Sequence, residues 1–524
     1  MRSSSASELP SSWAYAKISD IAGVNPKLVK SDIDDDFEVS FVPMSCVEAL
    51  SGRIDLKSIR RISEVSKGYT PFKEGDVLFA KITPCMENGK MAIVPALRNG
   101  HGFGSTEFHV LRPFSGVSAS YLYYFVSSQK FRNDAEHNMT GGVGQRRVPT
   151  TYLSEQRIPV PPQIEQNRIV AKIEELFSEL NRGVDVLATA REQLVAYRKA
   201  VLKYSFEGAI TSDWRAEHKN DIEAADVLLQ RISQERTFRY KKQLAEWESA
   251  VLVWKNGGEV EEKPLKPRKL NATESPAVDN GPSLPKEWRW ARVSEFADLV
   301  TDGTHHTPTY TSSGVPFISV KDIYDGAVHF EECKFISKKE HDSLIKRCKP
   351  EPGDLLITKS GTIGRLAVVP EKDFSLFVSV ALIKIQSAKA HISSRWLRYA
   401  FEHHIMGLNI DQDIKGGLLK NYHLEDLRLA KMPLCSYVEQ EALADVLDEK
   451  LTLADSFTKT LEEELGRIES LRQSILESAF SGKLVAQDLQ DEPASVLLER
   501  IRAEDGEEKA RKRRNNKNGK KEPA

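Results

Sequence analysis

A heptad pattern of apolar residues, which occurs twice, constrains the fold of this chain more than any other feature. The first run extends from Gln163 to Phe206, and the same frame returns 274 positions later. Apolar residues at heptad spacing place one continuous apolar seam along a helix. A helix of roughly 40 residues is about 60 Å long, which exceeds what one compact core requires. The sequence therefore predicts two long matched helices.

Aliphatic residues at heptad position a define the expected seam. The predicted seam residues are Ile173, Leu180, Leu187, Leu194, Val201, Leu447, Leu461, Ile468 and Ile475. The d positions are more varied and include Tyr197, Tyr204, Lys450, Phe457, Glu464 and Leu471. Two ordinary amphipathic helices in separate domains would also give helical periodicity. Both runs end at a matched glycine, Gly208 and Gly482, which favours a duplicated pair.

The regions before the two helices also match each other. Leu9-Pro10-Ser11-Ser12-Trp13 opens one lobe, and Leu284-Pro285-Lys286-Glu287-Trp288 opens the other. In each lobe short β-rich runs alternate with Gly, Pro and Asn turns, and helical patterns follow. The predicted fold class is therefore α+β (mixed α/β): two globular domains separated by an antiparallel coiled coil of two long helices, with an internal two-fold repeat. Parallel packing of the helices is the alternative, since the linker is long enough to return along a helix.

The 524 residues predict several structural units rather than one domain. We expect lobe 1 at 1–160, the first long helix at 161–211, a helical insert with a Pro-rich linker at 212–283, lobe 2 at 284–434, the second long helix at 435–484, and a short helix with a basic disordered tail at 485–524. The tail prediction rests on the run of lysines and arginines from Lys509 onward. Helical periodicity in the insert runs from Ala224 to about Val253.

Composition favours a cytoplasmic protein that is not bound to a membrane. No apolar run approaches the roughly 18 residues of a membrane span, and polar residues follow Met1-Arg2-Ser3 where a signal peptide would be apolar. The five cysteines are scattered and form no CxxC pair, which predicts reduced thiols rather than disulfides or a zinc site.

The sequence predicts no catalytic residues and no metal site. A nuclease would need a second acid two residues before Lys81 or Lys359, where Phe79 and Ile357 stand. Asn25-Pro26-Lys27-Leu28 lacks the second proline and the aromatic residue of an amino-methyltransferase loop. The pairs His305-His306 and His403-His404 are adjacent rather than four residues apart, so we expect surface or turn residues. We therefore expect a non-enzyme that binds no cofactor of its own.

Loops that combine glycine with hydrogen-bond donors are the positive chemical signal. Small residues permit close approach, and Arg, Lys, Thr and His side chains can contact phosphates and base edges. Solvated turns would have a similar composition. The hypothetical DNA contacts are Lys81, Lys90, Arg146, Arg147, His305, Lys359, Thr362, Arg365, Lys415 and Lys420.

Several motifs in both halves resemble one known family. Asp302-Gly303-Thr304-His305-His306-Thr307-Pro308 and the run from Gly353 to Gly364 look like the second half of a type I restriction–modification specificity subunit. The first half agrees through Phe41-Val42-Pro43-Met44 and the run from Gly75 to Pro84, although lobe 1 lacks the Asp-Gly-Thr-His element. The resemblance covers about Leu9 to Ile501.

The resemblance implies a non-catalytic DNA-recognition subunit. Members of the family read a bipartite sequence in double-stranded DNA, one half per lobe, with the long helices as the spacer. Two modification subunits bring S-adenosylmethionine, and restriction subunits bring ATP and Mg²⁺. Divergent lobes imply an asymmetric target. A coiled-coil scaffold without sequence-specific DNA binding and a self-contained DNA-modifying enzyme are the alternatives.

Overall fold

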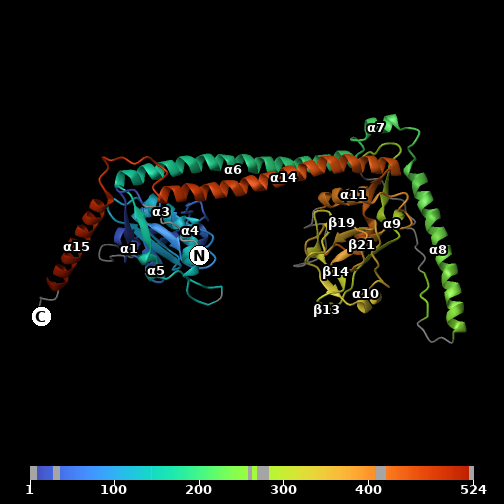
Figure 1. Ribbon diagram of the computed structural model, residues 1–524, viewed down its shortest axis with the longest axis horizontal. Helices are drawn as coiled ribbons and strands as arrows, with labels where there is room; N and C mark the ends of the chain where they lie inside the picture. Colours follow the sequence, from blue (N-terminus) through green and yellow to red (C-terminus); the bar gives the residue numbers. More distant parts are fainter. Residues whose placement is uncertain are drawn as a thin grey trace. The chain divides into compact units, whose positions relative to one another are not determined.

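The structure is a computed structural model that describes residues 9–27, 36–142, 144–257, 263–267, 282–408 and 421–518. The chain divides into two compact units, coloured by sequence in Figure 1. Unit 1 comprises residues 1–188 and 462–524, and unit 2 comprises residues 189–461. Each unit therefore contains one lobe together with a part of each long helix.

The two long helices run antiparallel within both units. Helix α6 spans Gln163–Phe206 and α14 spans Tyr437–Phe480, with 44 residues each. In unit 1 Arg472 donates to Asn181 Oδ1, and in unit 2 Arg198 Nη1 donates to Asp455 Oδ1 at 2.5 Å. A step of 17 residues forward along α6 thus moves the contact 17 residues back along α14.

The nine predicted seam residues are all buried or half-buried. The d positions differ from the prediction, because Tyr197, Tyr204, Phe457 and Leu471 are 42%, 54%, 52% and 51% exposed. The next residue along the chain is less exposed in each case: Arg198, Ser205, Thr458 and Arg472. The strict heptad frame was therefore wrong for these d positions.

Lobe 1 contains two four-stranded sheets and a two-stranded ribbon. The sheets have the orders β2-β9-β6-β7 and β4-β3-β8-β5, and β1 pairs with β10. The strands are β1 Ala14–Lys17, β2 Ala22–Val24, β3 Glu38–Val42, β4 Ile59–Arg61, β5 Thr70–Lys73, β6 Val77–Ala80, β7 Met91–Ile93, β8 His101–Gly104, β9 Phe108–Pro113 and β10 Arg157–Val160. The helices are α1 Ile18–Ile21, α2 Ile62–Val65, α3 Ala119–Ser127, α4 Gln129–His137 and α5 Thr150–Glu155.

Lobe 2 repeats this architecture. Its sheets have the orders β12-β21-β18-β19 and β13-β17-β14-β20, β11 pairs with β22, and β15 pairs with β16. The strands are β11 Arg289–Arg292, β12 Leu299–Asp302, β13 Tyr310–Thr311, β14 Val315–Ile318, β15 Ile323–Tyr324, β16 Ala327–Val328, β17 Lys334–Ile336, β18 Leu355–Thr358, β19 Leu366–Val368, β20 Ser375–Leu376, β21 Val380–Lys384 and β22 Lys431–Leu434. The helices are α9 Val293–Phe296, α10 Lys338–Leu344, α11 Ser394–Gly407 and α13 Leu424–Leu429. Parallel pairing of β3 with β8 and of β14 with β20 supports the internal repeat.

A buried tryptophan–glutamate pair joins each lobe to the helix that follows it. In unit 1 Trp13 Nε1 donates to Glu165 Oε2 at 3.0 Å, and in unit 2 Trp288 Nε1 donates to Glu439 Oε2 at 2.8 Å. Both glutamates are at most 1% exposed. A buried carboxylate is stable only when its oxygens accept hydrogen bonds, so these contacts fix the first turn of each long helix on its lobe.

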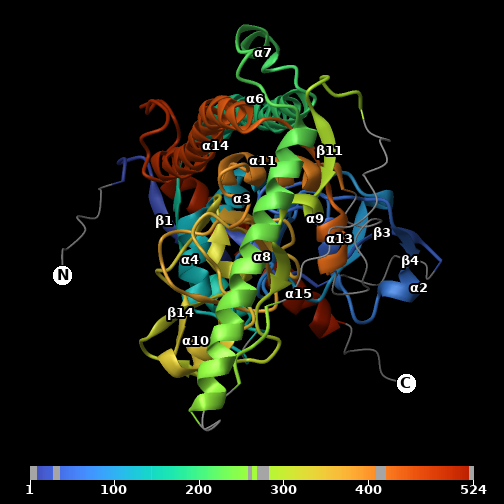
Figure 2. The ribbon, with the colours of Figure 1, turned by 90° about the vertical axis from the view of Figure 1, so that its right-hand side faces the viewer.

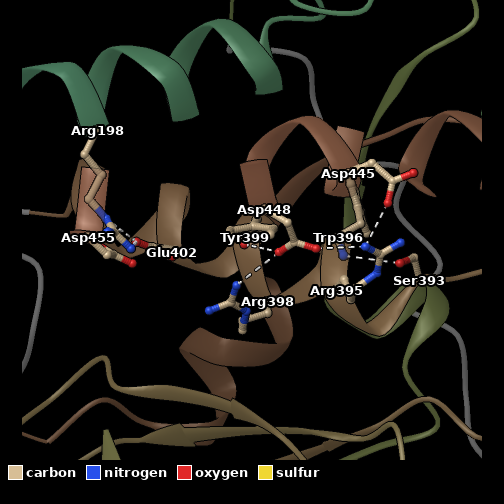
Figure 3. A network of polar contacts seen from close by, with 10 residues as sticks. All are labelled: Arg198, Ser393, Arg395, Trp396, Arg398, Tyr399, Glu402, Asp445, Asp448 and Asp455. Atoms are coloured by element: carbon tan, nitrogen blue, oxygen red, sulfur yellow. Dashed lines mark hydrogen bonds and ion pairs between the residues drawn. The ribbon is translucent and has the colours of Figure 1, made fainter. Parts of the chain in front are cut away.

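Ionic contacts join α11 to the long helices within unit 2, as Figure 3 shows. Arg395 donates to Asp445 Oδ1 at 2.9 Å and to Asp448 Oδ2 at 2.8 Å. Arg198 on α6 lies between Glu402 at 2.7 Å and Asp455 at 2.5 Å. In unit 1 aromatic contacts join the lobe to the long helices, since rings of α3 pack against Phe177 on α6 and Phe480 on α14. Each lobe is therefore held against both long helices.

A helix follows each long helix, after the short α7 (Ser212–Glu217) in the first case. Helix α8 spans Ala225–Asn256 and extends away from α9 as one long element (Figures 1 and 2). The Ala225 amide donates to Glu287 O at 3.0 Å, and the Ala494 amide, at the start of α15, donates to Ser12 O at 2.9 Å. Each of these helices thus begins beside the opening motif of the lobe in its own unit.

Helix α15 corrects the prediction of a basic disordered tail. It spans Ala494–Asn518 and so includes 509–518 of the expected tail, while residues 519–524 lie outside the described part. Lysine, arginine, alanine and glutamate are good helix formers, so a basic segment can continue a helix that packing has already started. No described helix is both long enough and apolar enough to cross a membrane.

Candidate nucleic-acid interface

Each lobe places one lysine directly after a central strand of its matched sheet. Lys81 follows β6 and Lys359 follows β18. In lobe 1 the Lys81 amide donates to Glu107 O, and the Lys81 carbonyl accepts from the Val148 amide. In lobe 2 the Lys359 amide donates to Ser379 O, and the Lys359 carbonyl accepts from the Tyr422 amide. The four N···O distances are 2.7–2.9 Å. The two positions are therefore structurally equivalent.

The side chains around Lys81 form an acid–arginine pair. Arg147 Nε and Nη2 donate to the Glu107 carboxylate at 2.9 and 2.7 Å. This hydrogen-bonded arginine holds the pKa of Glu107 below its ordinary value. The remaining nitrogen, Nη1, donates to Gln145 O at 3.3 Å. The guanidinium of Arg147 is thus engaged by lobe 1 itself.

The side chains around Lys359 form a larger cluster on one buried carboxylate. Asp302 ends strand β12 and its side chain is 4% exposed. Its oxygens lie 3.4 Å from Lys359 Nζ, 2.7 Å from Arg347 Nη2 and 3.2 Å from His305 Nε2. Lys359 is only 7% exposed, whereas Arg347 and His305 are more than half exposed. Lys359 therefore balances the buried charge, and the two outer groups face solvent.

The two equivalent backbone positions carry different polar groups. A base edge is distinguished by its arrangement of donors and acceptors, so a change in the protein groups at one position changes the preferred base. Lobe 1 presents a glutamate–arginine pair, and lobe 2 presents an arginine and a histidine on an aspartate. The described residues contain no group of three or more His, Cys, Asp or Glu side chains able to hold a metal ion.

The other predicted contacts have various surroundings. Lys90 Nζ donates to Met44 O at 3.1 Å, and Arg146 lies 3.5 Å from Glu136. Arg365 Nη1 lies 3.3 Å from two backbone oxygens, which ties it to its own lobe. Thr362 is exposed. Lys415 and Lys420 lie outside the described residues.

Two residues that we expected at the surface or in a turn lie within a helix. His403 and His404 are on α11 and are half-buried. His403 packs on Phe206 with ring centroids 5.2 Å apart, and His404 Nε2 lies 2.9 Å from the Tyr422 hydroxyl. Burial lowers the pKa of His404 to about 4. The adjacency of the two histidines in the sequence does not reveal which face of the helix is covered.

The Gly-Asp motifs are structural. Asp76 accepts two hydrogen bonds of 2.7 Å from Arg112, and Asp354 accepts from Gln386 Nε2 at 2.8 Å. Burial raises the pKa of Asp354. Both carboxylates are at most 1% exposed, so they stabilise the turn into the central strand.

Sequence reasoning missed three members of these sites. Asp302 lies within the quoted Asp-Gly-Thr-His motif, which was a usable signal. The pairing of Glu107 with Arg147 joins residues 40 positions apart, which only the fold brings together. Arg347 belongs to no motif, and only the fold brings it to Asp302, 45 positions away.

Comparison with known proteins agrees with this geometry. Residues 10–186 match the family model for the type I restriction modification DNA specificity domain. The EcoAI specificity subunit of Escherichia coli is 28% identical over 478 residues, which cover 84% of this chain and 78% of that protein. The EcoEI specificity subunit of E. coli is 27% identical over 510 residues, covering 87% and 80% respectively.

A solved structure shares the fold. Its chain covers 91% of this chain and 100% of its own length, with a TM-score of 0.65 and 18% identity, and comes from work on complex assembly and conformational transition of the type I R-M system. The family match and the relatives support a DNA sequence-specificity role for this chain. The chain is similar over most of its length to the specificity subunits of type I restriction–modification systems.

Proposed function

We propose that this chain reads a bipartite, asymmetric sequence in double-stranded DNA, with one half recognised by lobe 1 and the other by lobe 2. The observation that carries the proposal is the pair of equivalent lysine positions with different neighbours, Glu107–Arg147 in one lobe and Asp302–Arg347 in the other. Identical readers would suit a repeated half-site, whereas different readers suit two different half-sites.

The long helices act as the spacer between the two recognised halves. Lobe 1 is residues 1–160 and lobe 2 is residues 284–434, and each is joined to α6 and α14 by the contacts described above. Contacts to both helices hold each reader in a fixed orientation on the spacer. A fixed spacer requires a constant number of unread base pairs between the halves.

In this proposal the chain works in the cytoplasm with two modification subunits and with restriction subunits. Adenine methylation uses S-adenosylmethionine on the modification subunits, and DNA translocation and cleavage use ATP and Mg²⁺ on the restriction subunits. The specificity subunit selects the site and positions its partners there. The relatives are specificity subunits of type I restriction enzymes, which supports this division of labour.

Exchange of one lobe tests the proposal. Residues 284–432 are replaced by the corresponding lobe of another specificity subunit, and methylated adenines are mapped in cells that also carry the modification subunit. We expect one half of the target to change, while the other half and the gap stay the same. The reciprocal exchange of residues 9–158 is the matched control and changes the opposite half.

Two results would contradict the proposal. A single exchange that alters both halves would show that the lobes do not read independently. A full-length chain that assembles with its modification subunit but has no sequence-selective, salt-sensitive affinity for DNA would instead be a scaffold.

A further inference from the structure

Arg347 lies at the exposed end of a charge cluster whose base is buried. Its side chain is 56% exposed, and its Nη2 donates to Asp302 Oδ1 at 2.7 Å. Asp302 is fixed at the end of β12, where its backbone pairs with Ala381 on β21. The guanidinium is therefore held from one side by a carboxylate that cannot move freely.

The cluster leaves the charge of Arg347 available to a ligand. Lys359 lies 3.4 Å from the other oxygen of Asp302 and is nearly buried, so the negative charge of Asp302 already has a cationic partner. Arg347 thus adds a positive charge that the cluster does not neutralise. A DNA base edge or phosphate would complete the site.

The donors of Arg347 are also available, unlike those of Arg147. All three nitrogens of Arg147 donate within lobe 1. For Arg347, contacts with described residues involve Nη2 alone, to Asp302 and to His305 at 3.2 Å. The N–H groups on Nε and Nη1 are left for an external acceptor.

The loop next to Asp302 is rigid enough to keep this geometry. A Cβ on Gly303 would lie 1.9 Å from Leu376 O, so only glycine permits this close backbone approach. The Thr304 amide then donates to Leu376 O at 2.9 Å, and His305 follows. Preorganised side chains lose less conformational entropy on binding and give sharper discrimination.

We propose that Arg347 reads a guanine in the half-site of lobe 2, and that Asp302 is the positioning residue that orients it. Guanine offers two acceptors, O6 and N7, in the major groove, and arginine is the side chain that pairs with them most often. The inference rests on the proposed function of lobe 2 and names one of its specificity-determining residues.

The test uses the full chain with its modification subunit and maps methylated adenines for three variants. Arg347→Ala should relax one guanine position in the lobe 2 half-site and leave the other half unchanged. In competition binding, discrimination at that position should fall roughly 5- to 150-fold. Asp302→Asn leaves Arg347 in place and keeps the shape of the side chain at position 302, but it should relax the same guanine position. A purely structural role of Asp302 would not change that preference. Arg428→Ala is the control, because Arg428 is a similarly exposed arginine of lobe 2, paired with Glu425.

Other outcomes separate the inference from the proposed function. An unchanged guanine preference with a salt slope lowered by about one would make Arg347 a phosphate contact and overturn the inference. Unchanged specificity and unchanged salt slope would overturn it as well. Arg347→Ala could instead relax a guanine in the half-site that changes when lobe 1 is exchanged. That result would confirm that Arg347 reads a guanine, but it would refute the assignment of each half-site to a lobe.

Discussion

Removal of the Glu439 carboxylate should destabilise unit 2 more than any other single truncation at a lobe–helix junction. Glu439 is fully buried on α14 and accepts from Trp288, from Thr211 Oγ1 at 2.7 Å and from Arg215 at 2.7 Å. It therefore joins three segments: the opening of lobe 2, the loop after α6 and the start of α14. Glu439→Ala removes all of these contacts at once.

The expected loss follows from the charge that remains. The Arg215 side chain is only 14% exposed, so the variant leaves a cation with little water and no carboxylate. Breaking a buried ion pair by removal of one partner costs about 3–5 kcal/mol. The matched position in unit 1 is different, because the partners of Glu165 are the neutral groups of Trp13 and Gln487. Burial raises the pKa of Glu165, which shows that its charge is poorly solvated, so Glu165→Ala should cost only about 1–3 kcal/mol.

Hydrogen exchange followed by mass spectrometry can measure both units in one chain. Peptides that cover 284–300 report unit 2, and peptides that cover 9–25 report unit 1. We expect Glu439→Ala to accelerate exchange in the first set by about two to four orders of magnitude and to leave the second set nearly unchanged. Equal effects of Glu439→Ala and Glu165→Ala, each in its own unit, would refute the argument that the Arg215 charge makes the difference.

Two further predictions concern acid stability and the duplication. Folding lowers the pKa of His404 from 6.5 to about 4, so between about pH 4 and pH 6.5 the unfolded chain binds more protons than the folded chain. The stability of unit 2 should therefore decrease as the pH is lowered from about 6.5 to about 4. His404→Phe should flatten that dependence in denaturant titrations, and an unchanged slope would contradict it. A fragment that ends at residue 280 lacks α14 and α15, so the apolar seam of α6 is exposed. We expect this fragment to dimerise and, together with the modification subunit, to methylate a palindromic target. A monomer in sedimentation, or a dimer that retains the asymmetric target, would contradict this.

The sequence predicts the repeat and the long helices well because both are local or periodic signals. The central strands β6 and β18 are among the expected β-rich runs, since short apolar runs between turn residues are explicit in the chain. The exposed d positions, such as Tyr197, could not be assigned from a strict heptad, because heptad spacing alone does not show which of two neighbouring residues the partner helix covers. The extent of α15 was missed for another reason: charge density argued for disorder, while propensity favoured a helix.

The candidate sites were predictable only in part, because sequence position identifies residue types but not partners. Arg147 and Lys359 were both chosen as cations in donor-rich loops, yet Arg147 is engaged by Glu107, and Lys359 balances a buried aspartate. Arg347, which belongs to no recognisable motif, keeps its exposed donors. The physical criterion for a reader is therefore a cation that is oriented by the protein but not neutralised by it. The backbone is the same around Lys81 and Lys359, whereas the surrounding carboxylates and cations differ, and under the proposed function this difference sets which base edge each lobe prefers.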